Sequence, residues 1–95
     1  MSDKSQSLER GLAILELVDA EGAGLGVREI GRRLALSPTI VQRLVHSLVS
    51  SNFLMKDQET QKYSLGYRAL SLGSSLLSED NLISAAMPVL SKLAR

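Results

Sequence analysis

Apolar side chains between residues 38 and 49 recur with the spacing of one helix face. They lie three and four residues apart and should point into a core: Ile40, Val41, Leu44, Val45 and Leu48. Just before them, the Ser37 hydroxyl can accept a hydrogen bond from the first turn, and Pro38 suits the first helical position. The pattern predicts a helix that begins at Pro38 and buries this stripe.

The opposite side of this predicted helix is polar and carries no carboxylate. Its members are Thr39, Gln42, Arg43, His46 and Ser50. Arg43 could bond guanine through two donors, Gln42 could do the same for adenine, and Thr39 suits a phosphate or a thymine methyl. We interpret the helix as a DNA recognition helix in a major groove, with Ser37 and Ile40 also close to the DNA. The alternative is a polar face that is only solvated.

The preceding segment, residues 26–36, reads as a second short helix. Its inward positions are Val27, Ile30, Gly31 and Leu34, and its outward ones are Arg28, Arg32 and Arg33. Two short helices joined by a tight turn make a helix-turn-helix. Arg28 is therefore added to the DNA-binding candidates.

A first helix is predicted from Ser7, its N-cap, to about Ala20. We expect one face to hold Leu8, Leu12, Leu15 and Val18, while Ala13, Ile14 and Leu17 continue the apolar surface round the helix. Apolar residues on two sides of a helix in so short a chain favour a second burial surface, and we expect a dimer contact that uses Leu8, Ile14 and Leu17. The alternative is a helix enclosed in its own domain. Residues 21–26 then contain three glycines, which end the helix in a turn.

Two short strands are predicted after the recognition helix, at residues 53–56 and 62–65, around a turn at 57–61. A hairpin in this place is a wing. Lys56 and Lys62 flank its turn and could reach phosphates beside the groove. They could equally be solvated lysines that protect a sheet edge.

Two further helices are predicted after the wing, from Tyr67 to Leu77 and then to the end of the chain. The last one has an apolar side that we expect to join the dimer contact through Leu82 and Leu90, and Pro88 should kink it. The domain interpretation is a disordered N-terminus at 1–6, a winged helix-turn-helix at 7–66 and linker helices at 67–95. An apolar helix at the end suggests a cut polypeptide whose next domain is absent. The expected fold is mainly α with a small β-hairpin wing.

Charge along the chain is uneven although the formal net charge is only +1. Residues 1–26 contain two basic and five acidic side chains, whereas residues 27–56 contain five basic and one acidic. The positive field thus falls on the predicted helix-turn-helix, as phosphate binding would require.

Enzyme chemistry finds little support in the composition. The chain has no cysteine, and its one histidine, His46, has no paired acid nearby in the sequence. We expect no enzyme activity, metal or cofactor. The sequence also shows neither a signal peptide nor a membrane-spanning run, so we expect a cytoplasmic protein. A winged helix that only assembles proteins remains the main rival to DNA binding.

Four short motifs together resemble the IclR family of bacterial transcription regulators. They lie at residues 7–15 (SLERGLAIL), 27–30 (VREI), 39–44 (TIVQRL) and 63–66 (YSLG), and the resemblance covers about residues 7–95. It implies a winged helix-turn-helix and a linker helix that precede an effector-binding domain absent from this sequence. It also implies a protein at the bacterial nucleoid that binds a palindromic double-stranded operator as a dimer or a dimer of dimers, to repress or activate.

Two positions depart from the family's usual pattern. Pro38, Thr39 and Ile40 stand where a basic or small polar residue usually precedes a Ser-Thr pair, so no base preference carries over. The wing turn usually contains Pro and Gly, whereas this chain has Gln58 and Gln61. If Gln61 adopts a positive φ, the turn is strained or differently shaped.

Overall fold

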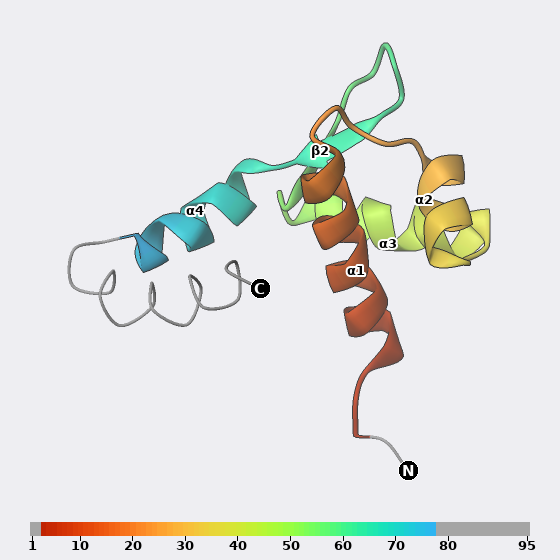
Figure 1. Ribbon diagram of the computed structural model, residues 1–95, viewed down its shortest axis with the longest axis horizontal. Helices are drawn as coiled ribbons and strands as arrows, with labels where there is room; N and C mark the ends of the chain where they lie inside the picture. Colours follow the sequence, from red (N-terminus) through yellow and green to blue (C-terminus); the bar gives the residue numbers. More distant parts are fainter. Residues whose placement is uncertain (1–2, 78–95) are drawn as a thin grey trace.

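Three helices form a small bundle, with a β-hairpin on one side and a fourth helix leading away from it (Figure 1). The structure is a computed structural model that describes residues 3–77. Its elements are α1 (Gln6–Glu21), α2 (Val27–Leu34), α3 (Pro38–Ser50), β1 (Leu54–Lys56), β2 (Tyr63–Leu65) and α4 (Tyr67–Leu76). The predicted mainly α fold with a hairpin wing is confirmed.

One apolar core joins α1, α2, α3 and the hairpin. The buried side chains are Ile14, Val18, Leu25, Ile30, Val41, Val45, Leu54 and Tyr63. Leu44 and Leu48 are half-buried and pack against this core, so four of the five predicted inward residues of α3 contact it, and Ile40 is half-buried outside it. Val27 and Leu34 pack against it from α2 in the same way. Each predicted face of the helix-turn-helix is therefore the observed one.

The predicted faces of α1 were wrong in part. The helix begins at Gln6, and its N-cap is Ser5 rather than Ser7, because the Ser5 hydroxyl accepts a hydrogen bond from the backbone N–H of Leu8 (3.2 Å). Leu8, expected at a dimer contact, is 62% exposed and so remains accessible to a partner. Ile14, expected at a dimer contact, is fully buried and is thus unavailable to a partner. Leu17, also expected at the dimer contact, is half-buried against the core, so little of its side chain is available to a partner.

The turn between α2 and α3 depends on Gly31. The backbone N–H of Leu36 donates to the Gly31 carbonyl (2.9 Å), and a Cβ at residue 31 would lie 2.7 Å from the Leu36 carbonyl oxygen. Ala35 completes the turn in the left-handed region with φ of 56°. These contacts bring α3 close against α2, and the predicted helix-turn-helix is confirmed.

The hairpin is extended by a segment that sequence reasoning took for a plain turn. Strands β1 and β2 pair antiparallel, with Lys56 opposite Tyr63. Leu25, in the glycine-containing linker after α1, forms an isolated bridge with Tyr63 through two backbone hydrogen bonds (3.1 and 2.7 Å). The linker therefore fixes β2 against the bundle.

The wing turn contains the backbone strain expected from its glutamines. Gln61 has a φ of 61°, in the left-handed region. Hydrogen bonds offset the strain, because the Asp57 carboxylate accepts from the N–H of Glu59 (2.9 Å) and the Gln61 side chain donates to the Gln58 carbonyl (2.7 Å). The turn is closed by the Gln61 N–H, which donates to the Asp57 carbonyl (2.7 Å).

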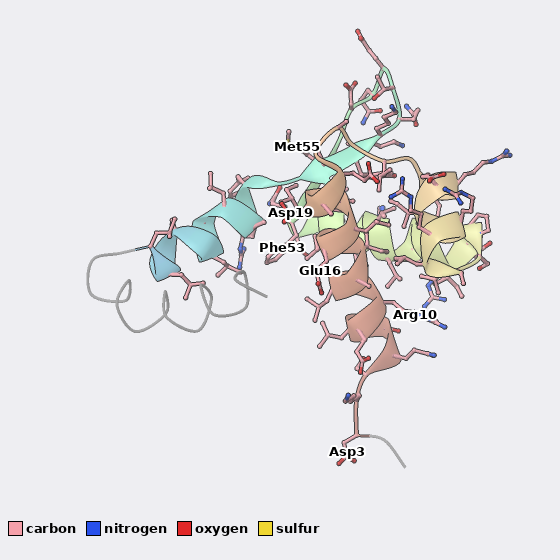
Figure 2. The ribbon with its side chains drawn as sticks, in the orientation of Figure 1. Asp3, Arg10, Glu16, Asp19, Phe53 and Met55 are labelled. Carbon is pink, nitrogen blue, oxygen red and sulfur yellow. The ribbon has the colours of Figure 1, made fainter. Side chains whose placement is uncertain are left out.

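The start of α4 is fixed to the end of α3. Asn52, with φ of 65°, follows α3, and its carbonyl accepts from the N–H of Arg68 (2.9 Å). A Cβ at Gly66 would clash with that same carbonyl oxygen. The Arg68 guanidinium lies over the ring of Phe53, 5.8 Å from its centroid, and Figure 2 shows Phe53 beside α4.

The body of α4 is largely exposed, with no buried residue, and Leu70, Leu72 and Leu76 are all more than half exposed. The predicted helix from Tyr67 to Leu77 is confirmed to within one residue. The predictions for Leu82, Pro88 and Leu90 lie outside the described residues.

Candidate nucleic-acid interface

The outward face of α3 is polar and exposed, as predicted. Thr39, Gln42, Arg43, His46 and Ser50 are all exposed. The Ser37 hydroxyl is engaged as the N-cap and accepts from the Ile40 N–H (3.3 Å), while the Ile40 side chain is half-buried. The first turn of α3 contains no acidic residue, so its positive dipole end is not neutralised there.

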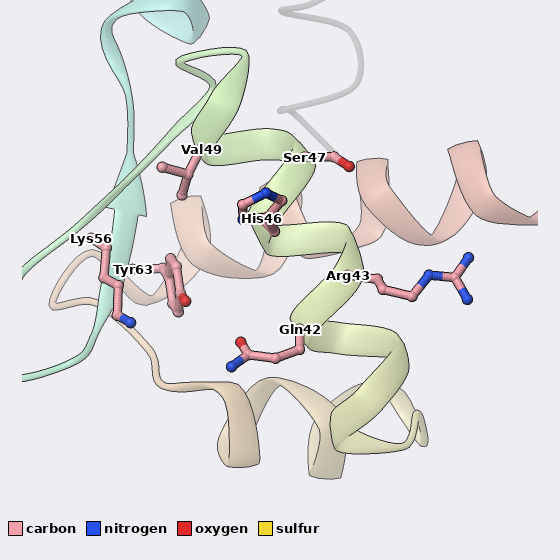
Figure 3. A pocket seen from close by; sticks show the side chains of 7 residues that line it. All are labelled: Gln42, Arg43, His46, Ser47, Val49, Lys56 and Tyr63. Carbon is pink, nitrogen blue, oxygen red and sulfur yellow. The ribbon is translucent and has the colours of Figure 1, made fainter.

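Two adjoining hollows separate α3 from the wing. The larger, of about 650 Å³, is lined by Gln42, Arg43, His46, Ser47, Val49, Lys56 and Tyr63 (Figure 3). The smaller, of about 410 Å³, has Arg28, Lys62, Thr60 and Gln61 among its lining residues and shares Gln42, Lys56 and Tyr63 with the first. Neither lining contains a carboxylate. Most of the predicted DNA-binding residues therefore meet on one concave side of the molecule.

The two long polar side chains of α3 point in different directions. Figure 3 shows Gln42 extending toward Lys56 and Tyr63 of the hairpin, whereas Arg43 extends to the opposite side of the helix. His46 lies between these directions, one turn further along α3. If α3 lies in a groove, the Gln42 amide and the Arg43 guanidinium could thus contact two separate parts of the ligand.

Two of the outward arginines of α2 are occupied by carboxylates. Arg32 and Arg33 both donate to Glu29, with Nε-to-oxygen distances of 3.0 and 2.8 Å, and Arg33 also pairs with Glu21 of α1. Hydrogen bonds from Arg32 and Arg33 lower the pKa of Glu29 to about 2. Fewer basic side chains are therefore available to a ligand than the count of basic residues in the sequence indicates.

The remaining basic side chains of this region surround α3 and the wing. Within residues 3–77, Arg28, Arg43 and Lys62 have no acidic partner, and Lys56 lies over the ring of Tyr63 with Nζ 5.7 Å from the centroid. All four line the hollows beside the hairpin. Their positions favour a ligand with a phosphate backbone.

Sequence reasoning missed Tyr63 as a site residue. Tyr63 is only 4% exposed, and its hydroxyl forms no hydrogen bond within residues 3–77. Because no fully buried side-chain oxygen there is left unpaired, the hydroxyl must open onto the hollows that Tyr63 lines. Its place opposite Lys56 follows from the hairpin register, which the strand pattern alone did not specify.

The described residues contain no group of acidic, histidine or cysteine side chains that could hold a metal ion. Across residues 3–77, no helix is both long and apolar enough to cross a bilayer.

Comparison with known proteins decides the family. The family model described as the IclR helix-turn-helix domain matches residues 7–58, more than half of the chain. The chain belongs to the IclR family. It thus carries the helix-turn-helix domain of these transcriptional regulators, and the resemblance noted in the sequence is confirmed.

Named relatives agree with this assignment. The chain is 33% identical over 88 residues to the HTH-type transcriptional regulator BhcR of Paracoccus denitrificans, covering 93% of this chain and 31% of that protein. It is 28% identical to the transcriptional repressor IclR of Escherichia coli, again over 93% of this chain and 32% of the relative. These IclR relatives are named as regulators, which supports the expectation that the chain is not an enzyme.

Solved structures show the same fold. An IclR family transcriptional regulator from Brucella abortus superposes with a TM-score of 0.76 at 31% identity, over 93% of this chain and 34% of that one. HmgR of Pseudomonas aeruginosa gives a TM-score of 0.71 at 32% identity, over 88% of this chain and 36% of that one. This IclR chain therefore spans about a third of the length of the proteins it matches.

Proposed function

We propose that this chain is the DNA-binding part of a transcriptional regulator and that α3 reads a double-stranded operator in the major groove. The observation that carries the proposal is the exposed, carboxylate-free face of α3 beside the hollows that separate it from a lysine-bearing wing. Thr39, Gln42, Arg43 and His46 are the candidates for base contacts. Ser37 and Ile40 lie at the N-terminal end of α3, which would enter the major groove first.

Phosphate contacts are assigned to the basic residues beside α3. Arg28 and Lys62 line the smaller hollow, and Lys56 lines both. Such contacts set the position of a protein on the duplex without reading sequence. Arg32 and Arg33 are left out of this set because Glu29 and Glu21 already occupy them.

The proposed organisation has three parts: an N-terminal segment at 1–6, the winged helix-turn-helix at 7–66 and linker helices at 67–95. Effector binding would belong to a separate C-terminal domain, in keeping with the greater length of the relatives. The regulator would act in the bacterial cytoplasm, at the nucleoid.

A homodimer on a palindromic operator is the proposed assembly, with a dimer of dimers as its extension. Leu8 and Leu12 of α1 are 62% and 49% exposed, and α4 adds Leu70 at 74%. Paired subunits would place two α3 helices in successive major grooves about 34 Å apart or at a multiple of that spacing. Changing Leu8 and Leu12 together to Glu should give a folded monomer by sedimentation, and a double variant that stays dimeric would assign pairing to another surface.

The test of DNA binding is electrophoretic mobility with fragments from upstream of the gene that encodes this chain, at two salt concentrations. Salt-sensitive retention of at least one fragment is expected, because neutralised phosphates release counterions. A winged helix that only assembles proteins would leave every fragment unretarded at both concentrations. Competition with random-sequence DNA then separates sequence-specific binding from general attraction.

A further inference from the structure

Tyr63, Lys56 and Gln42 make one wall that both hollows share. Lys56 and Tyr63 are directly opposite each other in the hairpin, so their side chains lie on the same face of it. The Lys56 ammonium lies over the Tyr63 ring, 5.7 Å from its centroid, and the Gln42 side chain extends toward both from α3 (Figure 3). The wall thus joins a cation, a hydroxyl and an amide.

We propose that Lys56 Nζ and Tyr63 Oη hold one backbone phosphate of the DNA strand that passes between α3 and the wing. The inference rests on the proposed function and adds a residue that donates a neutral hydrogen bond there. A phosphate oxygen accepts from both groups, and a hydrogen bond to a charged acceptor is stronger than one between neutral groups. Gln42 lies near enough to the wall to approach the same strand from the side of the helix.

The Tyr63 hydroxyl is held ready for such a ligand. The side chain is 4% exposed, and backbone hydrogen bonds to Leu25 fix residue 63 from the far side of the strand pair. The hydroxyl nevertheless forms no hydrogen bond within residues 3–77. A donor that is fixed in place and open on one side loses little freedom when it binds. The aromatic ring also restrains Lys56 through the cation–π contact.

Charge in the surroundings favours an anion in this position. The side chains that line the two hollows include Arg28, Arg43, Lys56 and Lys62, and no carboxylate. The nearest competing interaction for Lys56 is the Tyr63 ring, which leaves its ammonium protons free to donate. A DNA phosphate would therefore meet no like charge at the wall.

The test measures binding of the whole chain to a random-sequence duplex over a range of salt, because a phosphate contact acts on any sequence. Lys56→Gln should lower the salt slope by about one unit, as expected for the loss of one phosphate contact. Tyr63→Phe keeps the ring and should weaken binding about five-fold at each salt concentration with the slope unchanged, since a neutral donor releases no counterion. In the variant that carries both substitutions, Tyr63→Phe should lower the affinity for DNA by a smaller factor than it does alone.

Tyr67→Phe is the matched control, because Tyr67 is 65% exposed on α4 and lines neither hollow. It should bind like the unaltered chain. Equal binding by Tyr63→Phe and the control would overturn the proposed phosphate contact of Tyr63 while leaving DNA binding intact. Failure of the unaltered chain to bind any duplex would instead overturn the proposed function.

Thermal unfolding of each variant accompanies the titrations. If Tyr63→Phe loses its fold, Lys56→Gln decides the matter against Arg32→Gln, because Arg32 is paired with Glu29 and is not among the proposed phosphate contacts. An unchanged salt slope for Lys56→Gln would then overturn the proposed phosphate site, and a slope lowered by about one unit would support it.

Discussion

Helices α1 and α3 are both amphipathic, yet the sequence identified the buried side of only one of them. In α3, polar residues occupy one side throughout, and the apolar stripe opposite is the observed core face. In α1, apolar residues surround most of the helix, so two stripes satisfy the helical spacing equally well. The structure buries Gly11, Ile14 and Val18 and leaves Leu8 and Leu12 exposed. Helical spacing shows that a buried face exists, but polar residues show which face it is.

The choice in α1 is made by its neighbours. Ile14 and Val18 belong to the cluster that contains Ile30 of α2 and Val45 of α3. No local signal distinguishes the two stripes, because the shape of the surface formed by α2, α3 and β2 decides between them.

The largest expected effect tests the corrected face of α1. Ile14→Ala should lower the free energy of unfolding by about 2–5 kcal/mol, because it empties a fully buried site. Leu12→Ala, at a position that is 49% exposed, should cost about 1 kcal/mol or less. Urea unfolding of both variants makes the comparison, and equal losses would restore the face that the sequence suggested.

Gly31 of α2 and Gly11 of α1 should respond to alanine with opposite signs. Gly31→Ala should cost about 3 kcal/mol, because its Cβ would lie 2.7 Å from the Leu36 carbonyl oxygen. Gly11→Ala meets nothing within 4 Å outside its own helix and should raise the free energy of unfolding by about 0.5–1 kcal/mol. Chemical denaturation again provides the measurement. Destabilisation by Gly11→Ala would mean that α1 packs more closely than described.

The exposed face of α3 should be sensitive in binding rather than in stability. Arg43→Ala should cost about 1–3 kcal/mol on a cognate fragment and relax the preference at one base pair of each half-site. Arg32→Ala is the control, because Arg32 is engaged by Glu29 on α2. Titrations against cognate and random DNA compare them. Equal losses on both DNAs for Arg43→Ala would assign Arg43 to a phosphate and leave Gln42 and His46 to read bases.

The smallest effect concerns the wing turn, where a residue with a side chain adopts the conformation that favours glycine. Gln61→Gly should raise the free energy of unfolding by about 0.5 kcal/mol, because relief of the positive φ exceeds the loss of an exposed hydrogen bond to Gln58. The thermal midpoint should rise slightly. A fall would show that the bonds within the turn contribute more than the strain costs.

Most of the fold could be predicted because its signals are local. Ser37 and Pro38 start α3, the apolar spacing identifies the inward faces of α2 and α3, and two short strands flank the wing turn. The parts that sequence reasoning missed depend on residues far apart in the chain. The bridge between Leu25 and Tyr63 is one of them.

The candidate site divides in the same way. The exposed polar residues of α3 could be named from helical spacing alone, whereas the pairing of Arg33 with Glu21 needs the packing of α2 against α1. The open hydroxyl of Tyr63 likewise depends on hairpin register and on what lies across the hollow. Net charge per segment therefore overestimated the cationic surface and overlooked a neutral donor.

The close contact between Gly66 and the Asn52 carbonyl couples the orientation of α4 to that of α3. Since no side chain fits at residue 66 and Arg68 is bonded to the same carbonyl, the base of α4 has little room to swivel independently of the end of α3. A displacement of the far end of α4 would then be transmitted to α3, the helix that we propose reads the DNA. Even a small angular change at the base of α4 would shift the proposed contacts between the side chains of α3 and the base pairs.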